Sequence, residues 1–595
     1  MNHHHKALRL APLTRVLIAG VGLAGCSSAM ALDWNLGDVR INLDNRVSVG
    51  ALWRTEGPSK SSIGRAYGGT AYSNNIQNAD LAYRTGNLVY QTDKITSAFT
   101  ARYQNFGLFA RANYTYDPSQ VSQQYLNPTD YGPGRVYSQA TRASQEAAIH
   151  NHNANDGTLL DLYGFGSVTL LGHNLSFKVG KQIVNWGEST LVFNGLNSIV
   201  PLDADKARLP GAEVSEFVVP TQQISASFTV TDSISLQGWY QWKWEPTLVG
   251  TIGSYFPIPD QDFTAMGGIG ADTGFGAAPK NMAATTIPRS ADRQPGNSPE
   301  FGGAARFFIA SLNDTEVDLY AARYHSRLPL YSAISATSPG LAQTANYFSE
   351  YPEDIQMYGI SFNASALGFG WQGEYSYKPN QPLQLSSVEV ELTALGLPSQ
   401  LDPTVGGALG RQYVRGFRRH GVSQLDLGFT KLLPPSALAG WDQVMIIGEI
   451  AGDHVHGFES TRQLRYEGPH TFQPGDATSA AAVQAATGLA VPVQPGGYPT
   501  ANSWGYKLLA QATYNNVSPG ITLKPMLLWS HDVGGITPAP LDNFVRNSRS
   551  ITVGSDWRYF NNLTGNVSYT TYFGGGQDNL YRDRDFISTY VRYVF

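Results

Sequence analysis

The residues with the clearest potential for chemistry lie in the stretch GKQIVNWGEST, residues 180–190. The stretch begins with the alternation of a β-strand and then breaks at Trp186, Gly187, Glu188 and Ser189. A carboxylate beside a hydroxyl can serve catalysis, contact a ligand or form a structural knot of hydrogen bonds. The place of the preceding strand in the fold decides among these three roles.

More charged candidates follow in the same segment, residues 185–219. They are Asp203, Asp205, Arg208 and Glu213. Residues of opposite charge occur here together with prolines and glycines that favour turns. We therefore expect a loop with a defined fold, not a flexible tip.

No catalytic motif accompanies these residues. The sequence contains no G-x-S-x-G elbow, no H-E-x-x-H pair and no Walker loop. His150 and His152 could bind a metal ion, but a histidine pair in a polar loop is more often incidental. We therefore expect no enzyme activity, no cofactor and no metal site.

Composition narrows the class of protein. Only 15% of the residues are charged, the net charge is −5, and no basic run is present, so a nucleic-acid partner is not expected. The abundance of Gly (62), Tyr (32) and Trp (11) suits many strands joined by glycine-rich loops. No segment has the roughly 18 consecutive apolar residues of a transmembrane helix.

The N-terminus, residues 1–31, has the parts of a secretory signal peptide. Basic residues precede an apolar run, and Ala29-Met30-Ala31 forms a cleavage site before Leu32. Cys26, the only cysteine, ends a Leu-Ala-Gly-Cys sequence that is similar to a lipobox, so lipidation there is the competing outcome. We favour cleavage after Ala31, because strand-rich membrane proteins seldom carry lipid.

The remaining chain, residues 32–595, alternates between pairs of strands and long polar loops. In the strand near 233–244, Ile234 and Leu236 alternate with Ser235 and Gln237, which gives one apolar and one polar face. An average strand has roughly five or six residues, and most of the expected strands are longer. Their length suits a tilted strand that crosses a hydrocarbon layer.

Short connections within the pairs and long ones between them are typical of an outer-membrane barrel. We expect a single all-β domain, a transmembrane antiparallel barrel of the bacterial outer membrane with about 18 strands, in a range of about 16–20. Nine long loops would lie outside the cell and eight short turns in the periplasm.

The C-terminal strand supports this assignment. Val591, Tyr593 and Phe595 share one face, and this ending resembles the strand signal that the bacterial barrel-insertion machinery recognises. The expected partners are therefore outer-membrane lipid and that machinery.

Several motifs together resemble one family of proteobacterial outer-membrane proteins, domain of unknown function 1302. The motifs are GDVRINLDNRVSVGALWR, NFGLFARANYTYD, VGKQIVNWGEST, LPGAEVSEFVVP, YPEDIQMYGISFN, SHDVGGITP and YFGGGQDNLYRDRDF. They extend over the whole mature chain. The resemblance implies an outer-membrane barrel that often occurs beside a periplasmic companion protein and an inner-membrane exporter of the resistance–nodulation–division (RND) type.

In a barrel, residues 185–219 would fold into the mouth or lumen. We expect Trp186 to pack the root of this loop against the wall, and Glu188 to pair with inward basic groups or to accept backbone N–H bonds. Two inward carboxylates of the wall, Glu374 and Glu449, would brace the barrel or orient a permeating molecule.

The leading functional hypothesis is a passive conduit for small hydrophobic or amphipathic molecules. A general porin and a non-transporting barrel that anchors a periplasmic assembly are the alternatives. An outer-membrane hydrolase is the least favoured.

Overall fold

The computed structural model describes residues 32–75, 78–125, 139–256, 264–266, 268, 270–275, 285–296, 298–401 and 409–595. The expected signal peptide, Cys26 and the cleavage site at Ala31 lie outside the described residues.

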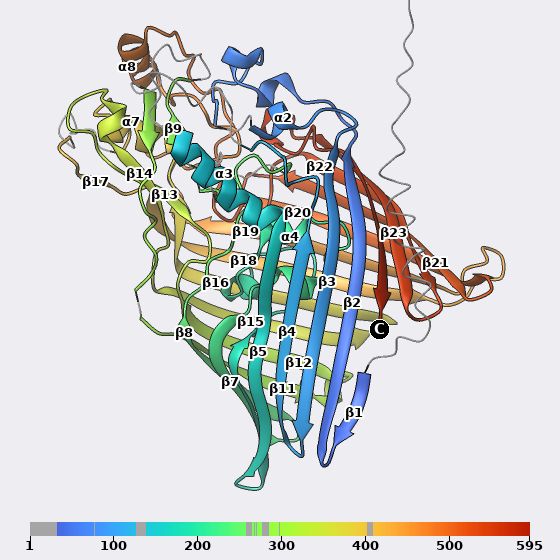
Figure 1. Ribbon diagram of the computed structural model, residues 1–595. Coiled ribbons are helices and arrows are strands. Elements are labelled where there is room, and N and C mark those ends of the chain that lie inside the picture. The colour runs from blue at the N-terminus through green and yellow to red at the C-terminus, as the bar shows by residue number, and fades with distance from the viewer. Residues whose placement is uncertain are drawn as a thin grey trace, which may run out of the picture.

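Eighteen antiparallel strands close into one barrel, which confirms the expected fold class and strand number (Figure 1). The barrel strands are β2 (Val39–Arg54), β3 (Leu88–Tyr103), β4 (Phe106–Tyr116), β5 (Asn155–Leu170), β6 (His173–Gln182), β7 (Thr221–Thr231), β8 (Ile234–Lys243), β11 (Glu300–Ile309), β12 (Thr315–Tyr324), β15 (Ile355–Ala366), β16 (Phe369–Gln384), β18 (Phe417–Leu433), β19 (Gln443–His456), β20 (Asn502–Ser518), β21 (Ile521–Gly534), β22 (Ser548–Tyr559), β23 (Leu563–Gly574) and β24 (Phe586–Val594).

The first and last barrel strands close the ring. β2 pairs with β24 from Arg46 opposite Val594 to Arg54 opposite Phe586. Asn45 and Phe595 add two backbone hydrogen bonds, with N···O distances of 2.8 and 2.9 Å. A short strand, β1 (Leu32–Leu36), pairs with the beginning of β2 and forms an additional hairpin. A closed ring satisfies the backbone of every strand, as a hydrocarbon environment requires.

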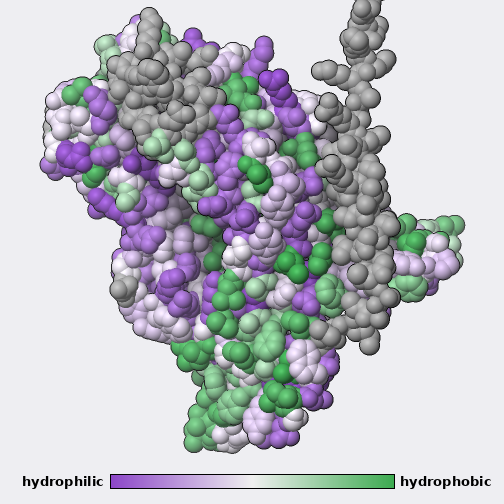
Figure 2. Space-filling model, viewed as in Figure 1, coloured by the Kyte–Doolittle hydropathy of each residue, from purple (hydrophilic) through white to green (hydrophobic). Residues whose placement is uncertain are grey.

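The wall has the two faces that the alternation predicts. Outward side chains such as Leu425, Leu527 and Val553 are exposed, whereas Asp426 and Glu449 point inward and are buried. On the face shown in Figure 2, hydrophobic residues gather over the lower part of the strands and hydrophilic residues predominate toward the loop end. No helix in the described part of the chain is long and apolar enough to cross a membrane.

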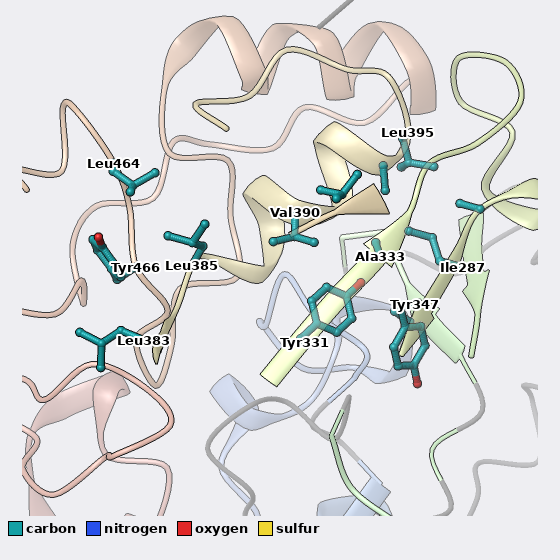
Figure 3. Close-up of a cluster of buried hydrophobic side chains, with 14 of the residues drawn as sticks. Ile287, Tyr331, Ala333, Tyr347, Leu383, Leu385, Val390, Leu395, Leu464 and Tyr466 are labelled. Atoms are coloured by element: carbon teal, nitrogen blue, oxygen red, sulfur yellow. The ribbon is translucent and has the colours of Figure 1, made fainter. Parts of the chain in front are cut away.

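The long loops fold into a compact cap at one end of the barrel, which the sequence patterns did not predict. Its small elements are α2 (Asn78–Ala82), α3 (Gln139–Asn153), β9 (Gly270–Asp272), β10 (Thr286–Pro288), β13 (Leu330–Ile334), β14 (Asn346–Glu350), α7 (Ser387–Ala394), β17 (Tyr413–Val414) and α8 (Ala477–Thr487). β13 pairs with both β14 and β17 in a three-stranded sheet. Tyr331, Tyr347, Val390 and Leu385 pack in the core between this sheet and α7 (Figure 3). This core holds the loop end of the barrel in one arrangement.

Candidate functional site

The segment between β6 and β7, residues 183–220, crosses the lumen, and we call it the constriction loop. It contains a 3-10 turn (Leu196–Ile199) and two short helices, α4 (Ala204–Ala207) and α5 (Val214–Phe217). Inward side chains from β2, β3, β8, β15, β16, β18, β19, β20 and β24 hold it. Because these strands lie on opposite sides of the ring, the loop divides the interior of the barrel.

Trp186 lies at the root of the constriction loop against the inner wall. Its indole Nε1 donates a 2.9 Å hydrogen bond to Gln237 Oε1 of β8. Its ring meets Trp239 edge-on at 6.0 Å and Tyr320 at 5.2 Å between centroids. The side chain is buried, so this aromatic cluster anchors the loop where it leaves β6.

Glu374 of β16 binds the backbone of the constriction loop at the sequence Gly-Glu-Ser-Thr, residues 187–190, and just beyond it. Its Oε2 accepts the N–H groups of Glu188 at 2.7 Å and Ser189 at 3.0 Å, and its Oε1 accepts that of Leu196 at 2.9 Å. The neighbouring Gly187 has φ +91°, and a Cβ atom there would lie 2.2 Å from the Glu374 carboxylate. The close approach of this carboxylate therefore requires glycine after Trp186.

Glu449 of β19 binds the next three residues in the same way. Its carboxylate accepts the N–H groups of Thr190 at 2.9 Å, Leu191 at 2.9 Å and Val192 at 2.7 Å. Ser189 Oγ lies 3.1 Å from Asp426 Oδ2, which adds a third wall carboxylate to the set. One wall carboxylate thus accepts three consecutive backbone N–H groups, and the serine contact beside them adds a further attachment of the loop to the wall.

The structure corrects the expected role of Glu188. Its carboxylate accepts a 3.2 Å hydrogen bond from Asn363 Nδ2, while the backbone N–H bonds expected for it are made by Glu374 and Glu449 instead. The alternation of β16 and β19 places Glu374 and Glu449 inward, but it carries no information about which loop they meet.

The far end of the constriction loop is fastened by ion pairs. Glu213 contacts both Arg46 of β2 and Arg592 of β24, the latter at 2.6 Å. Glu216 accepts a hydrogen bond from Lys94 Nζ at 2.7 Å. Glu213 and Glu216 also form the capping box of α5. The alternation of side chains along β3 could have predicted that Lys94 points inward. It could not have predicted the partner, Glu216, which lies more than a hundred residues away in the sequence.

Asp203 and Asp205 connect the constriction loop to α3 of the extracellular cap. Asp203 caps α4 through the N–H of Lys206, and Asp205 accepts the N–H of Thr251 at 2.8 Å. His152 Nε2 of α3 lies between them, 3.7 Å from Asp203 Oδ1 and 3.9 Å from Asp205 Oδ2.

Burial lowers the pKa of His152, but the hydrogen bond and charge of Asp203 and the charge of Asp205 outweigh it, so the pKa is raised overall. The histidine that we interpreted as incidental therefore occupies a structural junction. Arg208, from the same loop, donates a 2.9 Å hydrogen bond to the Tyr581 hydroxyl.

Two cavities flank the root of the constriction loop. The first, the apolar cavity, has a volume of about 510 Å³. Its surface is mostly apolar, with Phe193, Val214 and Leu328 among the contributors, although about half of its lining residues are polar. The second, the vestibule, has a volume of about 570 Å³ and lies beside the β3–β4 turn, between the turn-side parts of β3, β5, β6, β7 and β8. Ile183 and Asn185 line both cavities, so the two cavities are neighbours on either side of the loop root.

A group that resembles a catalytic triad lies at the loop end of the barrel. Ser298 Oγ is 3.0 Å from His325 Nε2, and the backbone N–H of Asp354 donates to His325 Nδ1 at 3.1 Å. Because Nδ1 accepts, Nε2 carries the proton and donates it to the Ser298 carbonyl at 3.0 Å. A protonated Nε2 cannot take a proton from Ser298, so this geometry does not form a nucleophile and base pair.

The same region contains a set of potential metal ligands, His325, Glu353 and Asp354. Their ligand atoms already have partners: Glu353 accepts the N–H of Gly296 at 2.7 Å, and Asp354 accepts Arg323 Nε at 2.9 Å. This cluster therefore joins loops to one another.

The closed ring, its apolar outer face and the loop folded into its polar interior define a transmembrane β-barrel of the bacterial outer membrane. Residues 13–595 match the model of a family described as protein of unknown function (DUF1302), and the chain belongs to this family.

Solved outer-membrane structures are similar over almost their full length, at low identity. A BenF-like porin from Pseudomonas fluorescens Pf-5 has 11% identity and a TM-score of 0.40, with 94% of this chain and 98% of that chain covered. OccAB1 of Acinetobacter baumannii has 7% identity and a TM-score of 0.39, with 93% and 96% covered. Pseudomonas aeruginosa OccK2, solved in complex with glucuronate, has 9% identity and a TM-score of 0.37, with 93% and 98% covered. No curated protein matches the chain.

Proposed function

We propose that the protein is an outer-membrane conduit for small hydrophobic or amphipathic molecules. The observation that carries this proposal is that two cavities lie next to each other at the loop root, where Ile183 and Asn185 line both. A molecule that passes the constriction loop at this point moves between a mainly apolar space and the vestibule. A mostly apolar surface with polar groups distributed along it is typical of sites for amphipathic ligands.

Conductance and uptake test this proposal against a general porin. In planar bilayers we expect small, flickering currents, because the constriction loop occupies the lumen. Replacing residues 187–217 with a short glycine–serine linker should give large, steady currents, while the barrel remains heat-modifiable. Large, steady and unselective currents from the unaltered protein would support the porin and contradict the conduit.

We further propose that the conduit works with a periplasmic companion protein and an inner-membrane exporter of the RND type. The exposed tips of the short turns support such a partner. Leu171, Leu367 and Leu438 lie at turn tips with exposed fractions of 86%, 91% and 100%. Leu171 and Leu367 have φ values of +53° and +55°, a conformation that costs a leucine roughly 1–2 kcal/mol.

Asparagine tolerates that backbone conformation better than leucine does, so Leu171→Asn and Leu367→Asn should preserve both turns. If the turns dock a periplasmic protein, the double variant should form fewer cross-links to that protein at unchanged barrel abundance. The alternative function, an anchor without transport, would require the same docking but no uptake of any amphiphile into liposomes.

A further inference from the structure

The apolar cavity is electrically neutral, although two arginines line it. Arg111 Nε lies 2.9 Å from Asp161 Oδ2, and Arg327 Nη2 lies 2.8 Å from Glu300 Oε2. Arg327 also donates to Gln241 Oε1 at 3.0 Å and to the Ile199 carbonyl at 3.1 Å. Both arginines form ion pairs with carboxylates of the barrel wall, so the apolar cavity has no unpaired charge for a ligand.

The vestibule differs, because the charges that line it have one sign. Its described lining includes Arg102 and Lys178 and contains no aspartate or glutamate. Arg102 lies over the Phe165 ring at 5.4 Å and Lys178 over the Tyr163 ring at 5.2 Å. These two rings are only 6.2 Å apart, so one aromatic pair brings the two cations together.

A third cation adds to this field. Arg40 of β2 is directly opposite Arg102 of β3 in the strand register. Asp33 partly balances Arg40 at 3.6 Å, with both side chains largely exposed. Like charges opposite each other destabilise a sheet, and an anion between them would relieve the repulsion.

We infer that the barrel binds a single-chain amphiphile with one anionic group, a carboxylate or a phosphate. The chain occupies the apolar cavity and the anionic head lies in the vestibule, beside Arg102 and Lys178. This inference rests on the proposed conduit function and specifies its cargo. The guanidinium of Arg102 can bind either oxyanion through two parallel hydrogen bonds.

The position of the head follows from the order of the two cavities. The vestibule lies beside the β3–β4 turn, and the short turns face the periplasm in a barrel of this class. The head therefore points to the periplasm and the chain to the constriction loop. Because the cations are solvent-accessible, binding of the head should weaken as ionic strength rises.

Binding of matched amphiphiles tests the inference. The full-length barrel in lipid nanodiscs is titrated with radiolabelled dodecanoate, dodecyl phosphate, dodecanol or dodecyltrimethylammonium, and binding to empty nanodiscs is subtracted. We expect both anions to bind about tenfold more tightly than dodecanol, from charge-assisted hydrogen bonds to the head. The ratio of dodecanoate to dodecyl phosphate then identifies the preferred oxyanion.

Variants assign this preference to the vestibule. Arg102→Gln with Lys178→Gln should remove the advantage of the anions and leave dodecanol binding unchanged. Arg102→Lys with Lys178→Arg keeps both charges and should preserve most of the advantage. Arg549→Gln, which removes an arginine that lines a different cavity, should change nothing. Heat-modifiability of each variant shows that its barrel is folded.

Two outcomes would overturn the inference while the conduit proposal stands. One is equal binding of dodecanol and both anions. The other is an anion preference that survives the double glutamine variant. Absence of binding by all four amphiphiles, together with passage of small hydrophilic solutes, would reject the conduit proposal and this inference with it.

Discussion

At the scale of single residues, the wall carboxylates Glu374, Asp426 and Glu449 hold the constriction loop. Glu449 accepts three consecutive backbone N–H groups of the loop, whereas Glu188 on the loop accepts one amide bond from Asn363. Each buried N–H group left without an acceptor costs roughly 1–3 kcal/mol. Glu449→Ala should therefore release the loop much more than Glu188→Ala does.

The two variants form a matched pair. For Glu449→Ala we expect faster proteolysis between residues 185 and 220 and noisier currents, with the barrel still heat-modifiable. For Glu188→Ala both measurements should stay close to those of the unaltered protein. Equal effects of the two variants would show that the wall carboxylate does not hold the loop.

The two faces of β22 provide a second prediction for single residues. Val553 is 53% exposed on the outer surface, whereas Thr552 Oγ1 is hydrogen-bonded inside to Thr570 Oγ1 at 2.8 Å. Near the bilayer midplane Val553→Arg should cost roughly 2–4 kcal/mol of the free energy of unfolding, and Thr552→Arg much less. Urea titration in lipid vesicles, followed by tryptophan fluorescence, measures both, and equal losses would contradict the assigned faces.

At the scale of elements, the contact between α3 and the constriction loop depends on the charge of His152. The charged groups that act on it are Asp203, Asp205 and Lys206. Glu146 and His150 of α3 contact each other instead. Its pKa is raised, so its stabilising effect is fully present below about pH 6.5, the ordinary histidine pKa. The effect is lost as the pH rises through the raised value.

Proteolysis of the α3 region should therefore become faster as the pH rises above about 6.5, where His152 begins to lose its charge. His152→Asn cannot carry the charge, and its proteolysis should be fast and almost independent of pH over this range. His150→Asn, two residues away and on a different face of the same helix, serves as the control and should retain the pH dependence. A flat profile for the unaltered protein would reject this junction as a pH-dependent contact.

At the scale of the whole molecule, the barrel is stable only as a closed ring. Phe595 contributes two backbone hydrogen bonds with Asn45, at the seam between β24 and β2. Deleting Phe595 removes these bonds and also the residue that we expect the insertion machinery to recognise together with Val591 and Tyr593. We expect less heat-modifiable protein in the outer membrane, while Phe595→Tyr should retain most of it.

Quantitative blotting of outer-membrane fractions, with and without heating, measures this effect. Normal amounts of folded protein after the deletion would show that neither the seam bonds nor the terminal aromatic residue is needed for assembly.

The barrel itself follows from local patterns in the sequence. The period-two alternation and the lengths of the connections predicted the fold class, a strand number of about eighteen and a place in the outer membrane. These features could be predicted because each strand in a lipid bilayer must satisfy the same constraint, an apolar outer face and a fully bonded backbone. That constraint acts on every strand, whatever lies across the lumen.

The interior was decided only by the tertiary structure. Glu374 and Glu449 accept backbone N–H groups of residues 188–196 across sequence separations of 178 to 259 positions, whereas the sequence pattern assigned that role to Glu188. The cap around Tyr331 and Val390 likewise assembles from loops that show no periodic pattern. Polar partners inside a barrel are selected by which strands curve to face one another, and that curvature exists only after the ring has closed.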